Sequence, residues 1–234
     1  MKVLAVGAHP DDLELLCGGT LARFAAEGHS VTMCNVSKGD RGSYEYSMEE
    51  IAAIRLTEAA EAARLIGADH VTLGFSDGEV NASDPRQRII AVDLIRQINP
   101  DIILTHDPSD YMSDHVEAGR LIEEASFIAS LPLFETEHPG RPCVPALYFF
   151  DTVTGLGFSP SEYVDISNFL DIKLAALEAH RSQVIWMREH DSVDFIENAR
   201  VASRYRGIQA GTSYAEGFRP CLKSLRPRTV RLLP

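Results

Sequence analysis

Short apolar runs alternate with helical patterns four times over the first 130 residues, and this alternation constrains the fold more than any other feature. The runs Lys2–Gly7, Ser30–Val36, Val71–Leu73 and Ile102–Thr105 have the near-continuous apolar character of strands that are buried on both faces of a sheet. Strands that alternate with helices favour right-handed crossovers and an α/β fold with a doubly wound, mostly parallel sheet. In such a fold, ligands bind at the carboxyl ends of the strands.

Capping and turn residues mark the helices between these strands. The first helix is predicted over LARFAAEG, after Gly18-Gly19-Thr20, and ends at Gly28. Ser47 and Glu50 form an S-x-x-E capping box for a second helix that ends at about Ile66. The two remaining helices are predicted from Asp84-Pro85 to about Ile98, and from about His115 to Ala129.

The C-terminal part of the chain is less regular. A Pro-rich connector, 132–145, precedes predicted strands at Ala146–Phe150 and near Tyr163–Ile166, and helices follow around 168–185 and 193–208. The sequence has no internal repeat, and no linker is long enough to separate a second domain. We therefore expect residues 1–234 to form a single domain, with this part as an irregular cover on the same sheet.

Composition excludes several classes of partner. The chain has 22 Lys and Arg against 34 Asp and Glu, so a net charge of −12 repels nucleic acid and acidic membrane surfaces. No apolar stretch reaches the roughly 18 residues of a membrane span, and the amino terminus lacks a signal sequence. The four cysteines form no C-x-x-C pair and are expected to be reduced thiols. We expect a cytoplasmic protein.

Two loops concentrate groups that bind metals. His9, Asp11 and Asp12 follow the first strand, and Pro10 fixes the turn between them, so an imidazole and a carboxylate can face one centre. A third ligand is expected from the loop after the fourth strand. Two histidines, one aspartate and an open position are typical of a hydrolytic zinc site, with Asp11 as general base. The fourth-strand loop offers His106, Asp107, Asp110, Asp114 and His115.

The first loop also allows two other interpretations. His9-Pro10-Asp11-Asp12 is also a plausible helix N-cap, because Asp and Pro are common at helix starts. A dinucleotide site is disfavoured, because the loop lacks the G-x-G-x-x-G pattern and its aspartates would repel a pyrophosphate.

Several motifs in this chain resemble the LmbE-like, or PIG-L, family of metal-dependent N-acetylglucosamine deacetylases. The most specific are Ala8-His9-Pro10-Asp11-Asp12 and Cys17-Gly18-Gly19-Thr20-Leu21. Further matches follow in order over about the first 185 residues: Arg55 and Glu58, Phe75-Ser76-Asp77-Gly78, Asp114-His115, and His180 with Ser182-Gln183. The resemblance implies a Rossmann-like fold and hydrolysis of an acetamido group on an amino sugar or its glycoside.

The resemblance also implies roles for individual residues. It makes His9, Asp12 and His115 the zinc ligands and Asp11 the general base, in agreement with the loop chemistry. Zn²⁺ is the expected cofactor, with Fe²⁺ as another divalent candidate. The substrate-binding positions are Arg55, Asp77 and His180. For Arg55, a surface ion pair with Glu58 one turn away is an equally simple interpretation, and His180 by spacing alone is only a helix-end histidine.

One departure from the family concerns the general acid. Many relatives have His-Pro-Asp-His where this chain has Met112-Ser113-Asp114-His115, and methionine cannot donate a proton. Either Asp11 serves as both base and acid, or a neighbour replaces the missing histidine. Asp114, which lacks that imidazole here, would orient His115 or bind a water. The candidate replacements are His106, Asp110, Tyr111 and His180.

The sequence therefore predicts a zinc-dependent N-deacetylase acting on a small amino-sugar substrate. A metal phosphoesterase is the first alternative, although it usually needs two metals and a longer set of ligands. A catalytically weakened sugar-binding protein of the same fold is the second, supported by Met112 alone. The sequence leaves open both the acceptor glycoside and assembly into a homo-oligomer.

Overall fold

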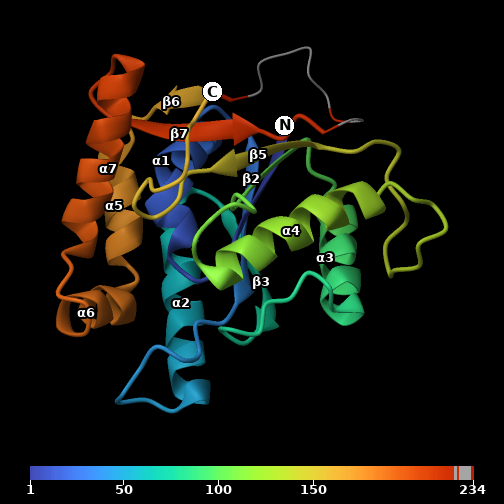
Figure 1. The fold of residues 1–234 in the computed structure, drawn as a ribbon, viewed down its shortest axis with the longest axis horizontal. Coiled ribbons are helices and arrows are strands. Elements are labelled where there is room, and N and C mark those ends of the chain that lie inside the picture. Colours follow the sequence, from blue (N-terminus) through green and yellow to red (C-terminus); the bar gives the residue numbers. More distant parts are fainter. Residues whose placement is uncertain (224–225, 227–232) are drawn as a thin grey trace.

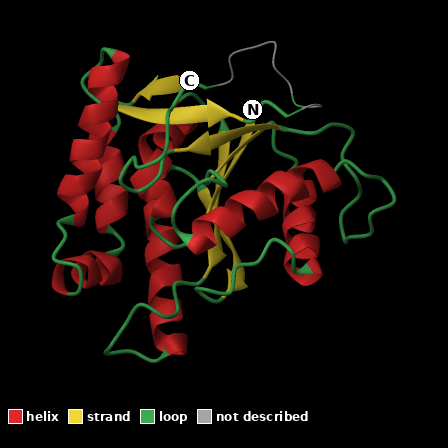
Figure 2. Cartoon of the chain, viewed as in Figure 1, coloured by secondary structure: helices red, strands yellow, loops and turns green. Residues whose placement is uncertain are grey.

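The computed structural model describes residues 1–223, 226 and 233–234, and it confirms an α/β fold. Within these residues, a single sheet contains seven strands, flanked by helices on both faces (Figures 1 and 2). The strands are β1 (Lys2–Gly7), β2 (Ser30–Ser37), β3 (Asp69–Phe75), β4 (Ile102–Thr105), β5 (Ala146–Phe150), β6 (Glu162–Asp165) and β7 (Ala215–Pro220).

The helices form two layers. In Figure 1, α3 and α4 cover one face of the sheet, and the remaining helices lie on the other side. The bounds are α1 (Asp12–Ala26), α2 (Met48–Ile66), α3 (Pro85–Ile98), α4 (Ser113–Ile128), α5 (Leu170–Glu178), α6 (Arg181–Glu189) and α7 (Phe195–Ala210).

Strand β1 shows why an apolar run was expected at its position. Val3 and Ala5 belong to the core shared with α1, α2 and α5, whereas Leu4 and Val6 belong to the core shared with α3 and α4. Successive side chains of a strand point to opposite faces, and both faces are covered here. All four side chains are therefore fully buried.

The strand order is β3-β2-β1-β4-β5-β7-β6, which places β1 between β2 and β4. The pairings from β3 to β5 are parallel, so these strands end at the same edge. The chain leaves β1 toward β2 and later returns to the other side of β1 as β4. Ligands in open α/β sheets bind at such a topological switch point. The loops after β1 and β4 lie at this place.

The first helix begins nine residues earlier than predicted, at Asp12 instead of Leu21. Gly18 and Gly19 lie inside α1 and do not precede it. They are needed for close packing, since a Cβ on Gly19 would lie 2.8 Å from Ile166, the residue after β6. Only the absence of a side chain lets the helix approach this segment.

The C-terminal cover differs from the prediction in two respects. Strand β7 was missed because its sequence, AEGFRP, contains Gly and Pro and lacks a clear alternation. It pairs antiparallel with both β5 and β6 and so completes the sheet. The helix expected over 168–185 is divided into α5 and α6, because the chain turns at His180 and buries that imidazole.

A buried ion pair attaches the cover to α1. The Lys173 ammonium on α5 lies 2.6 Å from the Glu216 carboxylate on β7 and also donates to the carbonyl of Leu15. Glu216 in turn accepts hydrogen bonds from the backbone N–H groups of Gly19 and Thr20. These bonds compensate the cost of burying both charges.

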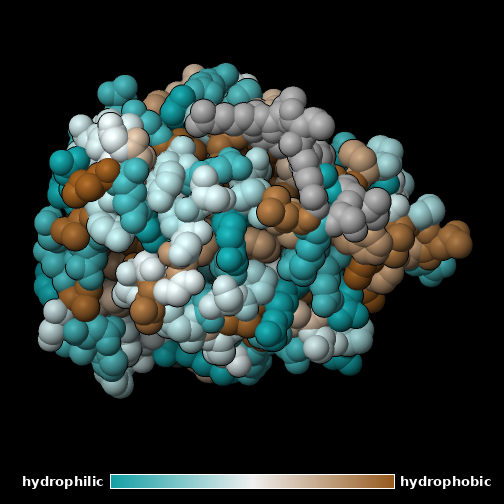
Figure 3. Space-filling view, turned by 45° about the horizontal axis from the view of Figure 1, so that its top comes forward, coloured by the Kyte–Doolittle hydropathy of each residue, from teal (hydrophilic) through white to brown (hydrophobic). Residues whose placement is uncertain are grey.

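All four cysteines are free. Within the described part of the chain, no helix combines the length and apolar character that crossing a bilayer requires. Figure 3 shows a face on which hydrophilic residues surround small, scattered hydrophobic patches.

Candidate functional site

The turn between β1 and α1 presents three polar side chains at the switch point. The backbone N–H of His9 donates to Asp12 Oδ2 at 2.7 Å, which holds the turn closed. Asp11 occupies the N-cap position of α1, but its side chain makes no capping hydrogen bond. Its φ of 119° lies in the left-handed region that non-glycine residues rarely adopt. The helix-cap interpretation therefore does not account for the Asp11 carboxylate.

The loop between β4 and α4 supplies the opposing side chains. His106 follows β4 directly and is fully buried. The Asp110 carboxylate accepts from the backbone N–H of Met112, the N-cap residue of α4, and so fixes the start of this helix. Asp114 and His115 then lie in its first turn, where both are buried.

His9, Asp12 and His115, the three ligands that the sequence proposes, lie close together in the structure. One ligand atom from each lies within 4.8 Å of the others. His115 Nε2 is 3.3 Å from Asp12 Oδ1, and His9 Nδ1 is 3.5 Å from Asp12 Oδ2. His115 Nε2 is buried and has no hydrogen-bond partner. An orphaned imidazole nitrogen beside a carboxylate is what a divalent metal ion would satisfy.

Each imidazole is oriented by a carboxylate on its other nitrogen. His115 Nδ1 lies 3.1 Å from Asp110 Oδ2, and His9 Nε2 lies 3.1 Å from Asp114 Oδ2. Such carboxylate–imidazole pairs are typical of metal sites, because they fix ring orientation and increase ligand basicity. Asp114 therefore contacts His9. Of the two roles expected for it, to orient His115 or to bind a water, the structure does not show the contact with His115. Asp114 also accepts from the backbone N–H of Gly78.

A second group, His106, Asp110 and His115, also places three ligand atoms within 4.8 Å. Hydrogen bonds already use two of its candidate nitrogens. His106 Nε2 accepts from the Ala8 N–H at 2.9 Å, and His115 Nδ1 faces Asp110. The His106 ring stacks on His115, with centroids 3.9 Å apart. His106 Nε2 also lies 3.1 Å from Asp12 Oδ2, so His106 contacts two of the three proposed ligands.

The electrostatics of the cluster favour positive charge at its centre. Burial lowers the pKa of His9, but hydrogen bonds with Asp114 and Asp12 outweigh it and raise the pKa to about 10. Burial likewise opposes the protonation of His115, yet Asp12 and Asp110 raise its pKa to about 9. Asp12 stays ionised, since the neighbouring imidazoles hold its pKa well below the usual value despite burial. The same field attracts a divalent cation.

Arg55 lies directly behind Asp11. Its guanidinium is buried and donates to the carbonyl of Pro10 at 2.6 Å and to Asp11 Oδ2 at 3.2 Å. The surface pair with Glu58 is not formed, because Glu58 accepts instead from the backbone and hydroxyl of Ser182. Burial raises the pKa of Asp11 to about 6, although Arg55 acts in the opposite direction.

His180 is more than a helix-end histidine. The turn between α5 and α6 buries it completely, with Nε2 3.2 Å from Glu14 Oε1. Burial lowers its pKa, but Glu14 and Asp11 outweigh this and raise it. Sequence reasoning missed Glu14, although a carboxylate within the apolar run LELLC of α1 was a signal for a buried partner.

Asp77 organises a loop at the edge of the site. Its carboxylate accepts from Ser37 Oγ at 2.7 Å and from the N–H of Gly39 at 2.9 Å. Asp40, which sequence reasoning did not single out, accepts from the Asp77 N–H and the Ser76 hydroxyl. Asp77 thus fixes the segment after β2. No substrate contact for Asp77 follows from this geometry.

The candidate general acids have different surroundings. Tyr111 is exposed, and its hydroxyl lies 3.2 Å from Thr154 Oγ1. Burial and the neighbouring His115 lower the pKa of His106 to about 4, so His106 is neutral near pH 7. Met112 is partly exposed at the start of α4. The pKa of Asp11, which burial raises to about 6, lies closer to neutrality than that of His106.

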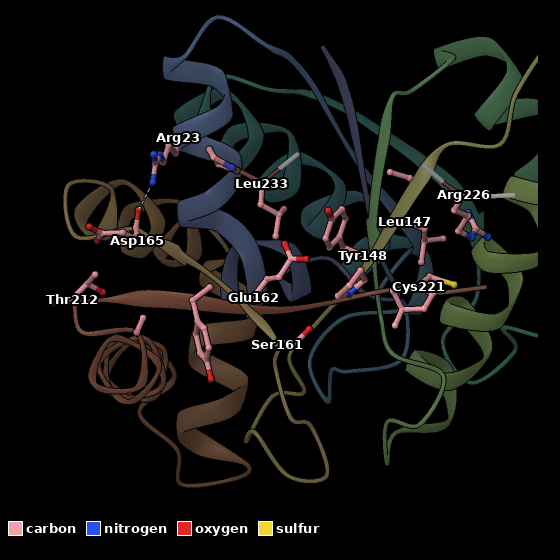
Figure 4. A pocket seen from close by; sticks show the side chains of 16 residues that line it. Arg23, Leu147, Tyr148, Ser161, Glu162, Asp165, Thr212, Cys221, Arg226 and Leu233 are labelled. Carbon is pink, nitrogen blue, oxygen red and sulfur yellow. Dashed lines mark hydrogen bonds between the residues drawn. The ribbon is translucent and has the colours of Figure 1, made fainter. Parts of the chain in front are cut away.

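A cavity of about 940 Å³ lies away from this cluster, over β5, β6 and β7 (Figure 4). At its rim, Arg23 donates to the backbone carbonyl of Asp165 at 3.2 Å. Its lining includes Tyr148 and Glu162 and none of the predicted site residues. The volume of a cavity therefore does not identify the candidate metal-binding site in this fold.

Two known proteins are similar to this chain over most of its length. The diacetylchitobiose deacetylase of Thermococcus kodakarensis is 31% identical, over 93% of this chain and 82% of its own length. The 1D-myo-inositol 2-acetamido-2-deoxy-alpha-D-glucopyranoside deacetylase 1 of Catenulispora acidiphila is 26% identical, over 93% of this chain and 77% of its own.

A solved structure of an enzyme that catalyses a different reaction is also similar to this chain. GalB, the 4-carboxy-2-hydroxymuconate hydratase of Pseudomonas putida, superimposes with a TM-score of 0.82 and 25% identity, covering 100% of this chain and 99% of its own. The relatives are therefore enzymes of two kinds, deacetylases and a hydratase. The family described as PIG-L, GlcNAc-PI de-N-acetylase, matches residues 4–126, which confirms the resemblance seen in the motifs. This chain belongs to the PIG-L family.

Proposed function

We propose that this protein is a zinc-dependent hydrolase that removes the acetyl group from an N-acetylglucosamine-type sugar or its glycoside. One observation carries the proposal. His9, Asp12 and His115 meet at the switch point with a buried, unpartnered imidazole nitrogen, and Asp11 lies next to them with no capping role. Deacetylation is also the reaction named for two of the relatives above.

Zinc would be held by His9, Asp12 and His115, with Asp114 and Asp110 fixing the two imidazoles. A zinc-class ion supplies Lewis-acid chemistry when bound, which makes water more acidic and an acetamide carbonyl more electrophilic. Fe²⁺ is a second candidate, since imidazole and carboxylate ligands also suit that ion.

Asp11 would carry the proton through the reaction. It takes a proton from the attacking water as the new C–O bond forms at the acetamide carbon. It returns this proton to the nitrogen as the C–N bond breaks, which releases acetic acid and the amine, and transfer of the acid's remaining proton to the amine gives acetate and the ammonium ion. Arg55 holds the carboxylate in place, and burial keeps its pKa close to neutrality. One group can thus perform both transfers without the histidine that Met112 replaces.

The likeness to GalB makes hydration a second candidate function. The substrate named for GalB is a carboxylated muconate, which is an anion. In this chain, three cations around the site are paired with carboxylates: Arg55 with Asp11, Arg41 with Glu79, and Arg219 with Asp107. Together with the net charge of −12, this arrangement favours a neutral amide over an anionic substrate.

The test combines metal analysis with product detection. Wild-type protein should bind about one zinc-class ion per chain and release acetate from N-acetylglucosamine or its glycosides. His115→Ala should lose most of both, whereas His138→Ala, whose imidazole pairs with Asp93 outside the site, should keep them. Undiminished metal in His115→Ala would refute the ligand assignment. Metal-loaded protein that releases no acetate would favour sugar binding, and turnover of an unsaturated carboxylate would favour hydration.

A further inference from the structure

The carbonyl groups of the turn 8–10 each accept a hydrogen bond from a residue of another element. The first accepts from the backbone N–H of Ser37 on β2 at 2.8 Å, and the third accepts from Arg55 on α2 at 2.6 Å. The second belongs to His9, and it accepts from Asn35 Nδ2 on β2 at 2.9 Å. Asn35 therefore fixes the peptide group of a proposed metal ligand.

The other hydrogen bond that the His9 carbonyl accepts from the described residues is weak. It comes from the backbone N–H of Asp12, at 3.4 Å. The His9 side chain is also the least enclosed of the three proposed ligands, with 17% exposed against 5% for Asp12 and 0% for His115. Rotation of the His9 peptide group would turn its Cα–Cβ bond and carry the imidazole away from Asp12. The hydrogen bond from Asn35 opposes this movement.

Asn35 is a buried amide on a face of β2 that packs against the core. Met33 and Asn35 are two positions apart and point to the same face, where Met33 belongs to the core shared with α1, α2 and α5. Asn35 is 4% exposed. A buried amide costs free energy unless it forms hydrogen bonds. Asn35 forms them with His9 through its nitrogen and with His70 through its oxygen.

His70 lies on β3, the edge strand next to β2 (Figure 1), and its Nε2 is 2.7 Å from Asn35 Oδ1. The direction of these hydrogen bonds is fixed, because the backbone carbonyl of His9 can only accept. Asn35 must therefore present its NH2 group to His9 and its oxygen to His70, and His70 Nε2 must carry a proton. Burial lowers the pKa of His70, so this ring is neutral near pH 7. A chain of donors thus runs from His70 through Asn35 to His9.

A cavity of about 180 Å³ lies beside this chain of donors, between the turn, β2, β3 and α2. Asn35 and His70 both line it, and so do Pro10 and Leu56. His70 is only partly buried. A shorter side chain at position 35 or 70 would enlarge a space that already exists, so we expect such variants to fold. Their effect on the site can then be measured on folded protein.

We infer, on the ligand set of the proposed function, that Asn35 and His70 are positioning residues that keep the His9 imidazole directed at Asp12 and His115. Neither residue is one of the clustered ligands, so both act through the His9 carbonyl. Groups that hold the ligands of a metal site typically change metal affinity or activity about 10- to 100-fold. The loss of either residue should therefore appear as weaker metal binding.

Zinc affinity, measured on folded, metal-free protein by competition with a chromophoric chelator, tests this role without catalysis. Asn35→Ala should weaken zinc binding about 10- to 100-fold. Asn35→Asp has the same size but cannot donate to the His9 carbonyl, and it should weaken binding at least as much. His70→Leu should cause a smaller loss, and His70→Gln, whose amide can donate to Asn35, should restore most of it. Leu56→Ala changes an apolar side chain of the same cavity and should bind zinc like the wild type.

Turnover at increasing zinc concentration provides the second readout. Saturating zinc should restore most of kcat in Asn35→Ala, because Arg55 still holds Asp11 in place. Wild-type zinc affinity in Asn35→Ala, or an equal loss of affinity in Leu56→Ala, would overturn the inference alone. Undiminished zinc in His115→Ala would refute the ligand set and the proposed function with it. Zinc binding that depends on both His115 and Asn35, without acetate release, would refute deacetylation and support the positioning role.

Discussion

Asp11 has a strained backbone in return for a defined position of its carboxylate. An L residue held in the left-handed region costs about 1–3 kcal/mol, and such strain is often found at functional sites. Arg55 maintains the conformation, because it binds both the carbonyl of Pro10 and the side chain of Asp11. These hydrogen bonds offset the strain and keep the carboxylate facing the ligand cluster and not the helix end.

Replacement of Asp11 by Asn should separate metal binding from turnover. The amide keeps the size of the side chain but cannot take up a proton, so kcat should fall about 10²- to 10⁴-fold while metal content stays unchanged. Asp69→Asn, at an exposed position at the start of β3, is the control and should retain full activity. A kcat within tenfold of wild type would place the base elsewhere.

At the scale of elements, the loop after β2 depends on the ionised form of Asp40. Burial alone raises the pKa of Asp40, but the Asp77 N–H, the Ser76 hydroxyl and Lys38 outweigh it and hold the pKa below 3.8. A carboxylate with a depressed pKa stabilises the fold above its unfolded pKa, and this stability is lost as the pH falls through the folded value.

Asp40→Asn should therefore destabilise the protein by about 1.5–3 kcal/mol at pH 7, because its hydrogen bonds are made to a charged acceptor. The difference from wild type should shrink below about pH 4, where the wild-type carboxylate also loses its charge. Urea unfolding of the wild type and of Asp40→Asn at several pH values measures this difference in stability. A difference that is constant with pH would mean that the charge contributes nothing.

Two adjacent glycines of α1 provide a matched pair for the close packing of the cover. Gly19→Ala should destabilise by about 1–3 kcal/mol, because its Cβ would lie 2.8 Å from Ile166. Gly18→Ala should be neutral or stabilising by up to about 1 kcal/mol, since the nearest atom is 3.5 Å away and Ala favours helix. Thermal unfolding measures the stability of both variants. An equal change in stability for Gly18→Ala and Gly19→Ala would contradict the packing argument.

The parts of the fold that could be predicted are those that obey local rules. The capping box at Ser47 placed the start of α2 correctly, and the apolar runs placed β1 and β4 at their observed bounds. The start of α1 and strand β7 escaped prediction, because Gly19 and Gly217 are set by contacts with Ile166 and Pro160, which are distant in sequence. The pairing of Glu14 with His180 also escaped prediction, because it depends on the turn after α5.

At the scale of the whole molecule, the Lys173–Glu216 pair decides whether the C-terminal cover stays on the sheet. Lys173→Met should cost about 3–5 kcal/mol, because it leaves the Glu216 carboxylate buried without its cation. Adding Glu216→Gln should restore part of this loss. Lys223→Met, which removes a largely exposed lysine paired with Glu123, should change stability by less than about 1 kcal/mol. Chemical denaturation that finds no difference between the two lysine variants would contradict this role.

The position of β7 also sets an order of assembly. Because β7 lies between β5 and β6, the sheet cannot close until residues 215–220 have emerged from the ribosome. Until then the parallel strands can pair, but β5 has an open edge, and open strand edges promote association with other chains. Chains that end before residue 215, which keep β5 but lack its partner β7, should therefore aggregate more readily than chains that retain β7.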